Sequence, residues 1–413
     1  MFDALIFQIE NNFVPNMMNS LGFIFPLLVV VVPLFLIYVS WNLRAYYMRR
    51  LFIIKAPRIL LEIKVPKEVF KSPAAMEVFL YTLAQTGGEG NPYQYMWQGK
   101  SRSYFSLEIC SFGGAIKFFV WTEKKYKNII EAALYAQYPN VEIYEADDYT
   151  KNIFAVKSDY AFSGSEFITT RKTEKEGWFP IKTYMDYNLQ ENEKEEFKID
   201  PIYPMIEFLA TIKQGEQIWF QIVIKALKDR KPFDALVAKS ISMLLKRDPI
   251  TLLSVAVNDK GMQAMAQISK AERDTADAIH RNASKSVFEV GMRALYVAKK
   301  DKFNSASIGA MMGIVKQFGS NNLNSFKPNN GTSKDDYPWS DFMNIRTDIA
   351  KREALHAYKL RCFFNPPYEH KTMFMTSEEI ATIFHLPGKE IQTPTFARLE
   401  SRKVDAPANL PIG

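Results

Sequence analysis

The chain has 413 residues, 47% of them hydrophobic and 14% aromatic, which favours two or three folded domains and excludes a disordered chain. Its formal net charge of +7 is mild and does not by itself argue for nucleic acid as a partner. The only cysteines, Cys110 and Cys362, exclude a disulfide framework and suit a reducing compartment.

The first predicted element is a transmembrane helix. Residues 21–41, from Leu21 to Trp41, contain no charged residue, and at 1.5 Å per residue they extend over roughly 30 Å, one hydrocarbon core. A cleaved signal peptide is the competing interpretation, but no basic segment precedes the run and no small-residue cleavage site follows it. Residues 1–20 are then expected to form a short amphipathic segment outside the membrane.

The charges that flank this span predict its orientation. Asp3 and Glu10 precede it, whereas the juxtamembrane segment 42–57 and the residue after it are basic. The basic residues are Arg44, Arg49, Arg50, Lys55 and Arg58. The positive-inside rule therefore predicts a single-pass protein of the cell membrane, with its N-terminus outside and its body in the cytoplasm. The basic segment is also expected to touch anionic membrane lipid.

Residues 58–148 are predicted to form a first ferredoxin-like lobe. Period-two patterns indicate strands at 58–65, 103–109, 115–121 and 141–146, and helical spacing indicates helices at 73–85 and 125–138. The resulting βαββαβ order is typical of an antiparallel sheet with two helices on one face.

Residues 149–330 are predicted to form a second lobe of the same kind. We expect strands at 152–162, 178–184, 216–227, 286–298 and 322–328, and helices at 201–212 and 305–318. An Ala- and Met-rich stretch at 232–283 is predicted to be a helical insertion. The fold class expected for the whole chain is α+β, with one transmembrane helix and two ferredoxin-like lobes.

Residues 331–413 are predicted to hold two further helices and a proline-rich tail. The helices are expected at 348–360 and 376–386, with Ser377 as the N-cap of the second. The tail that follows is typical of a linker.

The tripeptide Gly99-Lys100-Ser101 has the form of a P-loop ending. A P-loop also needs a glycine at position 94, where this chain has Gln94, so we interpret the tripeptide as a turn. The four histidines lack metal-ligand spacing, and no serine or cysteine stands beside a histidine base. The pairs Asp147-Asp148 and Asp335-Asp336 are weak candidates for a cation. We therefore expect no metal, no cofactor and no catalytic residue.

Three aromatic residues on predicted strands are candidates for stacking nucleic-acid bases: Tyr104, Phe118 and Trp121. Lys100, Arg102 and Lys117 would supply positive charge nearby. The alternative is that these rings fill the core between sheet and helices.

Several blocks of the sequence resemble the region upstream of the motor in HerA-like and conjugation-type (type IV secretion) ATPases. The blocks are 58–77, 125–149, 200–227, "MTSEEIATIFHLPGKEIQTP" (375–394) and "SRKVDAPANLPIG" (401–413). The chain has no Walker A sequence, so the resemblance implies a non-catalytic, membrane-anchored component of a conjugation-like translocation machine. It also implies a separately encoded P-loop ATPase as the partner.

In that family the stretch similar to residues 401–413 leads into the nucleotide-binding domain. The resemblance therefore favours residues 376–413 as the segment that docks the ATPase, through the apolar residues Ile380, Phe384, Phe396, Leu399 and Leu410. The alternative is that this segment packs back on the lobes of its own chain. The alternative function is a membrane-tethered nucleic-acid-binding module, and an enzyme of unrecognised type is a weaker third option. Self-association and the nature of the cargo, DNA or protein, are left open by the sequence.

Overall fold

The computed structural model describes most of the chain, as two compact units. The described residues are 14–65, 72–86, 88, 90–151, 153, 159–171, 173–187, 200–245, 270–333, 339, 341–365 and 367–387. One unit combines Met1–Lys55 with Glu89–Ser101, and the other, here called the body, combines Ala56–Gly88 with Arg102–Gly413. The tail beyond residue 387 lies outside the described residues.

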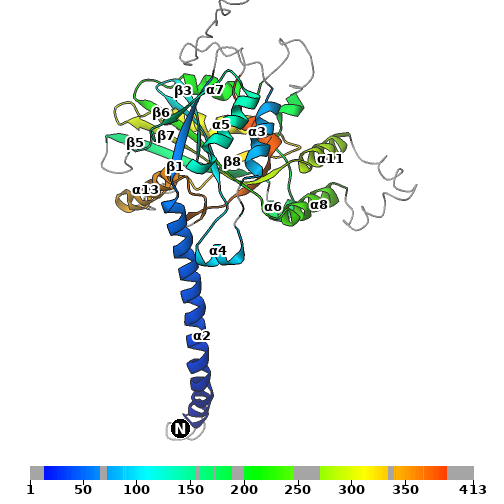
Figure 1. Cartoon of the computed structure of the whole chain (residues 1–413). Helices are drawn as coiled ribbons and strands as arrows, with labels where there is room; N and C mark the ends of the chain where they lie inside the picture. The colour runs from blue at the N-terminus through cyan, green and yellow to red at the C-terminus, as the bar shows by residue number, and fades with distance from the viewer. Residues whose placement is uncertain are drawn as a thin grey trace, which may run out of the picture. The chain divides into compact units, whose positions relative to one another are not determined.

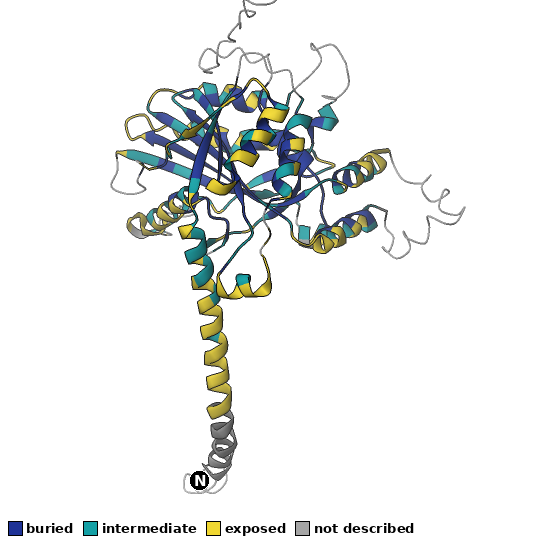
Figure 2. Ribbon diagram, viewed as in Figure 1, coloured by how far each residue is buried: buried dark blue, intermediate teal, exposed yellow. Residues whose placement is uncertain are grey.

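The first unit is built from one long helix and one short helix. Helix α2 runs without interruption over Val14–Lys55, and α4 covers Pro92–Trp97 (Figure 1). The part of α2 from Val29 onward is long and apolar enough to cross a membrane, by length and composition. Its valine, leucine and phenylalanine side chains between residues 29 and 36 are exposed (Figure 2). The predicted apolar N-terminal helix is therefore confirmed, although it continues past Trp41 to Lys55.

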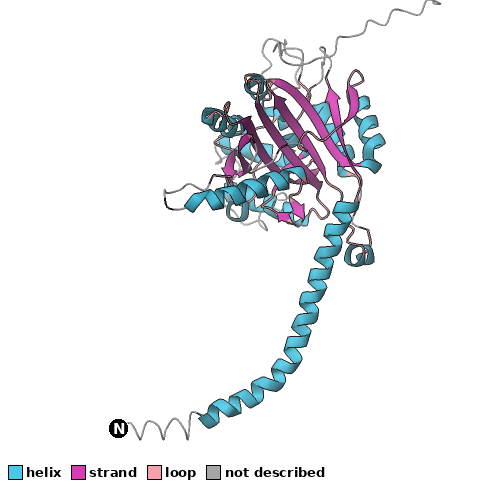
Figure 3. Cartoon of the chain, turned by 90° about the vertical axis from the view of Figure 1, so that its left-hand side faces the viewer, coloured by secondary structure: helices cyan, strands magenta, loops and turns pink. Residues whose placement is uncertain are grey.

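The body is dominated by one large antiparallel sheet of nine strands (Figure 3). The strands are β1 (Arg58–Lys64), β2 (Phe105–Phe112), β3 (Ala115–Glu123), β4 (Glu142–Ala146), β5 (Tyr160–Thr169), β6 (Glu216–Ala226), β7 (Val287–Lys299), β8 (Phe326–Asn329) and β11 (Met373–Thr376). The order across the sheet is β4-β1-β3-β2-β6-β7-β5-β8, and β11 pairs with the first part of β7. A mixed α/β fold around an antiparallel sheet is thus confirmed.

The two halves of this sheet repeat one strand order. In the first half, β4-β1-β3-β2 are neighbours, and in the second half, β8-β5-β7-β6 are neighbours in the corresponding order. The halves join where β2 pairs with β6, with Cys110 opposite Trp219. The chain therefore builds one continuous sheet where the sequence analysis expected two lobes.

Strand β6 shows why both faces of the sheet are covered. Ile218, Phe220 and Ile222 face one core, whereas Trp219 and Val223 face another. This alternation follows from the period-two geometry of a strand.

Among the described residues, five helices cover the first face and one helix covers the second. The first-face helices are α3 (Ala74–Ala84), α5 (Lys127–Gln137), α7 (Tyr203–Ala210), α12 (Ser305–Ile314) and α14 (Ser377–Ile383). Helix α13 (Ile345–Lys359) packs on the second face through Leu355 and Tyr358. A small hairpin of β9 (Phe364–Asn365) and β10 (Tyr368–Glu369) follows it.

Two helices between β6 and β7 build a third, smaller core. Helices α8 (Lys231–Leu245) and α11 (Lys270–Ala283) pack together. Phe233 of α8 and Trp178 belong to this core, and their rings meet edge to face at 4.8 Å. These helices lie at the two ends of the predicted insertion 232–283.

The strand predicted at 178–184 is wrong. Residues 178–183 have no regular structure, and Tyr184 begins a 3-10 helix (Tyr184–Tyr187). The segment looks like a strand because Trp178, Phe179 and Ile181 are apolar, but these side chains are divided between two cores. The strand expected at 152–162 begins at Tyr160 and continues to Thr169.

The N-cap predicted at Ser377 is one residue late. Thr376 caps α14: its hydroxyl accepts a hydrogen bond from the amide of Glu379, and the Glu379 side chain accepts from the amide of Thr376. This reciprocal capping box fixes the start of the helix.

The outer strands of the sheet are short and carry polar or proline residues. Strand β4 has five residues, and its Glu142 and Glu145 are exposed. Strand β8 has four residues, of which Lys327 and Pro328 form the middle.

Candidate functional site

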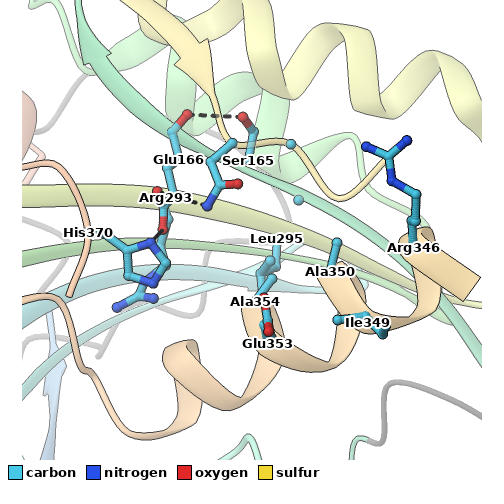
Figure 4. A pocket seen from close by; sticks show the side chains of 13 residues that line it. Ser165, Glu166, Arg293, Leu295, Arg346, Ile349, Ala350, Glu353, Ala354 and His370 are labelled. Carbon is cyan, nitrogen blue, oxygen red and sulfur yellow. Dashed lines mark hydrogen bonds and ion pairs between the residues drawn. The ribbon is translucent and has the colours of Figure 1, made fainter. Parts of the chain in front are cut away.

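The second face of the sheet holds a cavity of about 290 Å³ between α13 and β5 (Figure 4). Five of its lining side chains are ionisable: Glu166, Arg293, Arg346, Glu353 and His370. His370, Glu166 and Arg293 are grouped at one end, and Arg346 of α13 lies at the other. The apolar Ile349 and Ala350 of α13 form the wall between them.

The carboxylate of Glu166, at the first of these ends, interacts with two neighbouring side chains. Glu166 Oε1 lies 3.1 Å from Nδ1 of His370. Its other carboxylate oxygen accepts a hydrogen bond of 3.4 Å from the side-chain amide of Asn330. The carboxylate therefore orients both the imidazole and the amide at the cavity wall.

The cation of this group is Arg293, which reaches the cavity from the middle of β7 and is 2% exposed. Its Nε donates to Gln221 over 2.8 Å, and one terminal nitrogen donates to the Cys362 carbonyl over 2.7 Å. The other terminal nitrogen has no hydrogen-bond partner among the described residues. Burial lowers the pKa of Arg293, and the charge of Glu166 opposes that shift.

These groups do not form a nucleophile–base pair. The Ser165 hydroxyl donates to the backbone carbonyls of Asn329 and Glu166, each over 3.0 Å, so its proton is directed at main chain. His370 directs Nδ1 at Glu166. Nucleophilic catalysis would need the serine and the imidazole to share a hydrogen bond.

Gln221 connects Arg293 of the cavity to a largely buried charge network centred on Arg361. Arg361 Nε lies 3.0 Å from Glu108 Oε1, both side chains are completely buried, and a terminal nitrogen of Arg361 also pairs with Asp148. Gln221 donates to the same Glu108 oxygen over 2.9 Å, and accepts from Arg293. The network therefore joins strands β2, β6 and β7 to the chain after α13.

The backbone of Arg361 shows how strongly this position is fixed. Its φ is +49°, in the left-handed region that usually takes glycine after a helix. The amide of Cys362 donates to the Ala357 carbonyl over 3.0 Å, which closes the end of α13 in a Schellman arrangement. The ion pairs with Glu108 and Asp148 compensate for the unfavourable backbone conformation.

Burial and pairing shift the titration of this network. Desolvation lowers the pKa of Arg361, but Glu108, Tyr149 and Asp148 outweigh it and hold that pKa well above its ordinary range. Burial would raise the pKa of Asp148, and the Arg361 charge reverses this into a lowered pKa. Both groups are therefore charged at neutral pH, and the network is a structural ion pair.

A second buried ion pair, between His385 and Asp200, gives a pH-dependent prediction. His385 is 1% exposed, and its Nε2 lies 2.9 Å from Asp200 Oδ1. Burial lowers the pKa of His385, but the charge and hydrogen bond of Asp200 outweigh burial and raise it above its ordinary value of 6.5. Because the folded pKa is the higher one, this pair stabilises the fold below the unfolded pKa, and the contribution is lost as pH rises through the folded pKa.

We therefore expect the denaturant midpoint of the full chain to fall as pH rises from about 6 to about 8. His385→Gln should flatten this slope, whereas His280→Gln, at an exposed position, should leave it unchanged. An unaltered slope in His385→Gln would contradict the assignment.

The residues proposed to stack bases are buried. Tyr104, Phe118 and Trp121 are 2%, 1% and 8% exposed, with Phe118 in the first core and the other two in the second. Base stacking needs an exposed ring face. This candidate site is therefore wrong, because helices and the chain after α13 cover both faces of the strands.

Two of the proposed docking residues are also buried. Ile380 and Phe384 are 0% exposed and belong to the first core, where the Phe384 ring meets Phe118 edge to face at 5.9 Å. They stabilise the body and offer no surface to a partner. Phe396, Leu399 and Leu410 lie outside the described residues.

The P-loop-like tripeptide belongs to the first unit and forms a turn after α4. Gly99 has a φ of +67°, and the Lys100 amide donates to the Gln94 carbonyl over 3.0 Å. The interpretation as a turn is therefore confirmed. Asp148 pairs with Arg361, whereas Asp147 is exposed and lies 3.1 Å from Lys151, so the two carboxylates do not share a site. Asp335 and Asp336 lie outside the described residues.

The basic residues that follow the span have different surroundings. Arg44 lies over the Trp97 ring and Arg49 over the Tyr95 ring, both within the first unit, and Arg50 and Lys55 are exposed. Arg58 instead belongs to β1 of the body, where its guanidinium lies over Trp121 at 4.6 Å. Arg58 is therefore a packing residue rather than a lipid contact.

The sequence analysis missed the buried network entirely. Its signal is a charged residue in the middle of an apolar strand: Glu108 in "SLEIC" and Arg293 in "VGMRALYV". Such residues are almost never fully buried unless they are paired. Each of the two therefore predicts a buried polar partner, although the partners, Arg361 for Glu108 and Gln221 for Arg293, cannot be found by spacing.

Comparison with known proteins places the body in a family. No curated protein matches the chain. A family model described as a domain of unknown function, DUF8128, matches residues 56–398. This match starts directly after α2 and covers well over half of the chain, so the protein belongs to the family of the domain of unknown function DUF8128.

Proposed function

We propose that this protein is a single-pass membrane anchor whose cytoplasmic body docks a separate ATPase. The observation that carries the proposal is helix α2, an uninterrupted apolar helix that leads directly into the family domain. Its described side chains from Val29 to Leu43 are uncharged, and Arg44, Arg49 and Arg50 follow them. Positive charge on this side supports an N-terminus outside and a cytoplasmic body.

The role we propose for the body is non-catalytic. The cavity beside α13 supports this view, because its serine, imidazole and carboxylate are each engaged with other groups. The charge network behind it stabilises the fold. We propose that a body whose buried charges are paired to stabilise the fold acts as a docking platform rather than as an enzyme of unrecognised type.

The ATPase partner is proposed from the resemblance to HerA-like and conjugation-type ATPases. The repeated strand order of the sheet supports a finer proposal for the fold, namely two ferredoxin-like units joined through β2 and β6. We propose that the motor-binding segment is the chain after residue 394, since its counterpart in those ATPases leads into the motor. The burial of Tyr104, Phe118 and Trp121 argues against the nucleic-acid-binding alternative.

A capture experiment tests this function. The full chain, purified from its own membranes in mild detergent, is expected to retain a P-loop ATPase, identified by mass spectrometry. A variant that ends at residue 394 should lose the ATPase while keeping its fold and its membrane attachment. Lys100→Ala is the matched control and should retain the partner, because Lys100 lies in the turn after α4.

Two results would contradict the proposal. One is capture of no P-loop ATPase by the full chain, and the other is ATP turnover by the purified chain itself. A reporter fused after Arg50 tests the orientation separately: it should be active on the cytoplasmic side.

A further inference from the structure

Helix α4 carries large side chains that its own unit leaves uncovered. None of its residues is buried, and Tyr93, Met96 and Trp97 are 60%, 42% and 42% exposed. The helix is nevertheless well formed: Asn91 caps it by accepting a hydrogen bond of 2.8 Å from the Gln94 amide, and Pro92 occupies its first position. These three side chains are called the α4 surface below.

Contacts within the unit hold α4 against one stretch of α2. The Trp97 ring meets Trp41 edge to face at 5.7 Å, and the Arg44 guanidinium lies 4.0 Å from the Trp97 ring centre. Arg49 lies over the Tyr95 ring at 4.5 Å. The contacts therefore extend along α2 from Trp41 to Arg49.

Gly99 brings the turn after α4 directly against the α2 backbone. A Cβ atom at this position would lie 2.3 Å from the Met48 carbonyl group and 2.5 Å from the Arg49 nitrogen. Together with its φ of +67°, this close approach requires glycine. The glycine that suggested a P-loop thus serves to dock α4 on the helix.

The stretch of α2 that α4 touches is where the uncharged part of the helix ends. The described residues from Val29 to Leu43 are uncharged, and the first basic residue is Arg44. From Trp41 to Arg44 the helix rises about 4.5 Å, which fits within the ~5–8 Å depth of one headgroup layer. Trp41, Arg44 and the α4 surface therefore lie at the level of the lipid headgroups if α2 spans the bilayer.

We propose that the α4 surface is a second membrane contact, which lies in the headgroup region of the bilayer that α2 spans. This inference rests on the proposed membrane span. Tryptophan and tyrosine are favoured at this depth because their rings are apolar and their N–H and O–H groups remain in contact with water. Arg44 and Arg49 place cations beside the rings, where lipid phosphates lie. The occupant is therefore phospholipid.

Spin-label depth measurement on the full chain tests the proposal. Met96→Cys is labelled with a nitroxide in vesicles of phosphatidylcholine and phosphatidylglycerol; the native Cys110 and Cys362 are buried. Tyr81→Cys, at an exposed position of α3, is the reference for water, and Phe35→Cys is the reference for the span. We expect the nitroxide at 96 to collide with oxygen several-fold more often, and with a water-soluble nickel chelate several-fold less often, than the nitroxide at 81.

The other outcomes overturn the proposal in distinguishable ways. If position 96 matches position 81 while position 35 reads the bilayer interior, the span stands and the α4 surface is not a membrane contact. If the nitroxide at position 35 is also as accessible to the nickel chelate as the nitroxide at 81, α2 does not span the bilayer and the proposed membrane span is wrong. If position 96 is shielded from both oxygen and nickel, a protein covers the α4 surface and lipid does not.

Discussion

Replacing Arg361 by alanine is expected to lower the free energy of unfolding by about 3–5 kcal/mol, the usual effect of removing one partner of a buried ion pair. Arg361 and Glu108 are both fully buried, with Nε 3.0 Å from Oε1 and Nη2 3.3 Å from Oε2. Alanine would leave the Glu108 carboxylate without its cation and would open space between α13 and the sheet. Guanidinium chloride unfolding of the full chain in detergent, followed by tryptophan fluorescence, measures this loss.

A matched control separates the network from a general effect of losing an arginine. Arg352 lies on α13 and is exposed, so Arg352→Ala should change the stability by no more than about 0.5 kcal/mol. Arg361→Lys should also be strongly destabilising, because an ammonium group cannot reproduce the fork that reaches Glu108 and Asp148. A loss below about 1 kcal/mol in Arg361→Ala would show that the network does not hold α13 to the sheet.

Placing two arginines in the apolar part of α2 is expected to abolish stable membrane attachment. Val32 and Phe35 are 44% and 61% exposed, so their replacements would face lipid. Each arginine near the centre of a span opposes insertion by about 2.5–3.5 kcal/mol, so Val32→Arg with Phe35→Arg opposes it by roughly 5–7 kcal/mol. Extraction of membranes with alkaline carbonate, which releases peripheral proteins, distinguishes the outcomes.

The same substitutions on the body serve as the control. Val78 and Tyr81 are exposed on α3, and Val78→Arg with Tyr81→Arg should leave the chain resistant to carbonate. If the variant of α2 remains equally resistant, the chain is held in the membrane by something other than this helix.

Elements with strong local periodicity could be predicted from the sequence. Helix α5 and strands β6 and β7 lie within one or two residues of their expected bounds, because their apolar residues repeat at one spacing. The strand predicted at 178–184 was wrong because the apolar residues of this segment are divided between two cores. No local sequence pattern distinguishes that arrangement from a strand. The joining of β2 to β6 also escaped prediction, since pairing between distant strands leaves no mark on spacing.

The buried sites were harder to predict because their members come from distant parts of the chain. Glu108 on β2 meets Arg361 only after α13 has packed on the sheet, and His385 meets Asp200 only after α14 has packed on the other face. The aromatic residues were misjudged for a related reason. The residues around Trp121 show the same alternation of apolar and polar types whether its ring faces water or is covered by a distant segment. In the structure, Arg58 and Arg361 lie over that ring.

The short outer strands β4 and β8 influence how copies of this protein meet at high local concentration. A sheet edge exposes unpaired amide and carbonyl groups, and two such edges can join into an aggregate. On β4, exposed Glu142 and Glu145 would place like charges opposite each other in a self-pairing, and on β8, Pro328 lacks the amide that a new strand would need. These two edges therefore disfavour the joining of neighbouring copies into an extended β-sheet through β4 or β8.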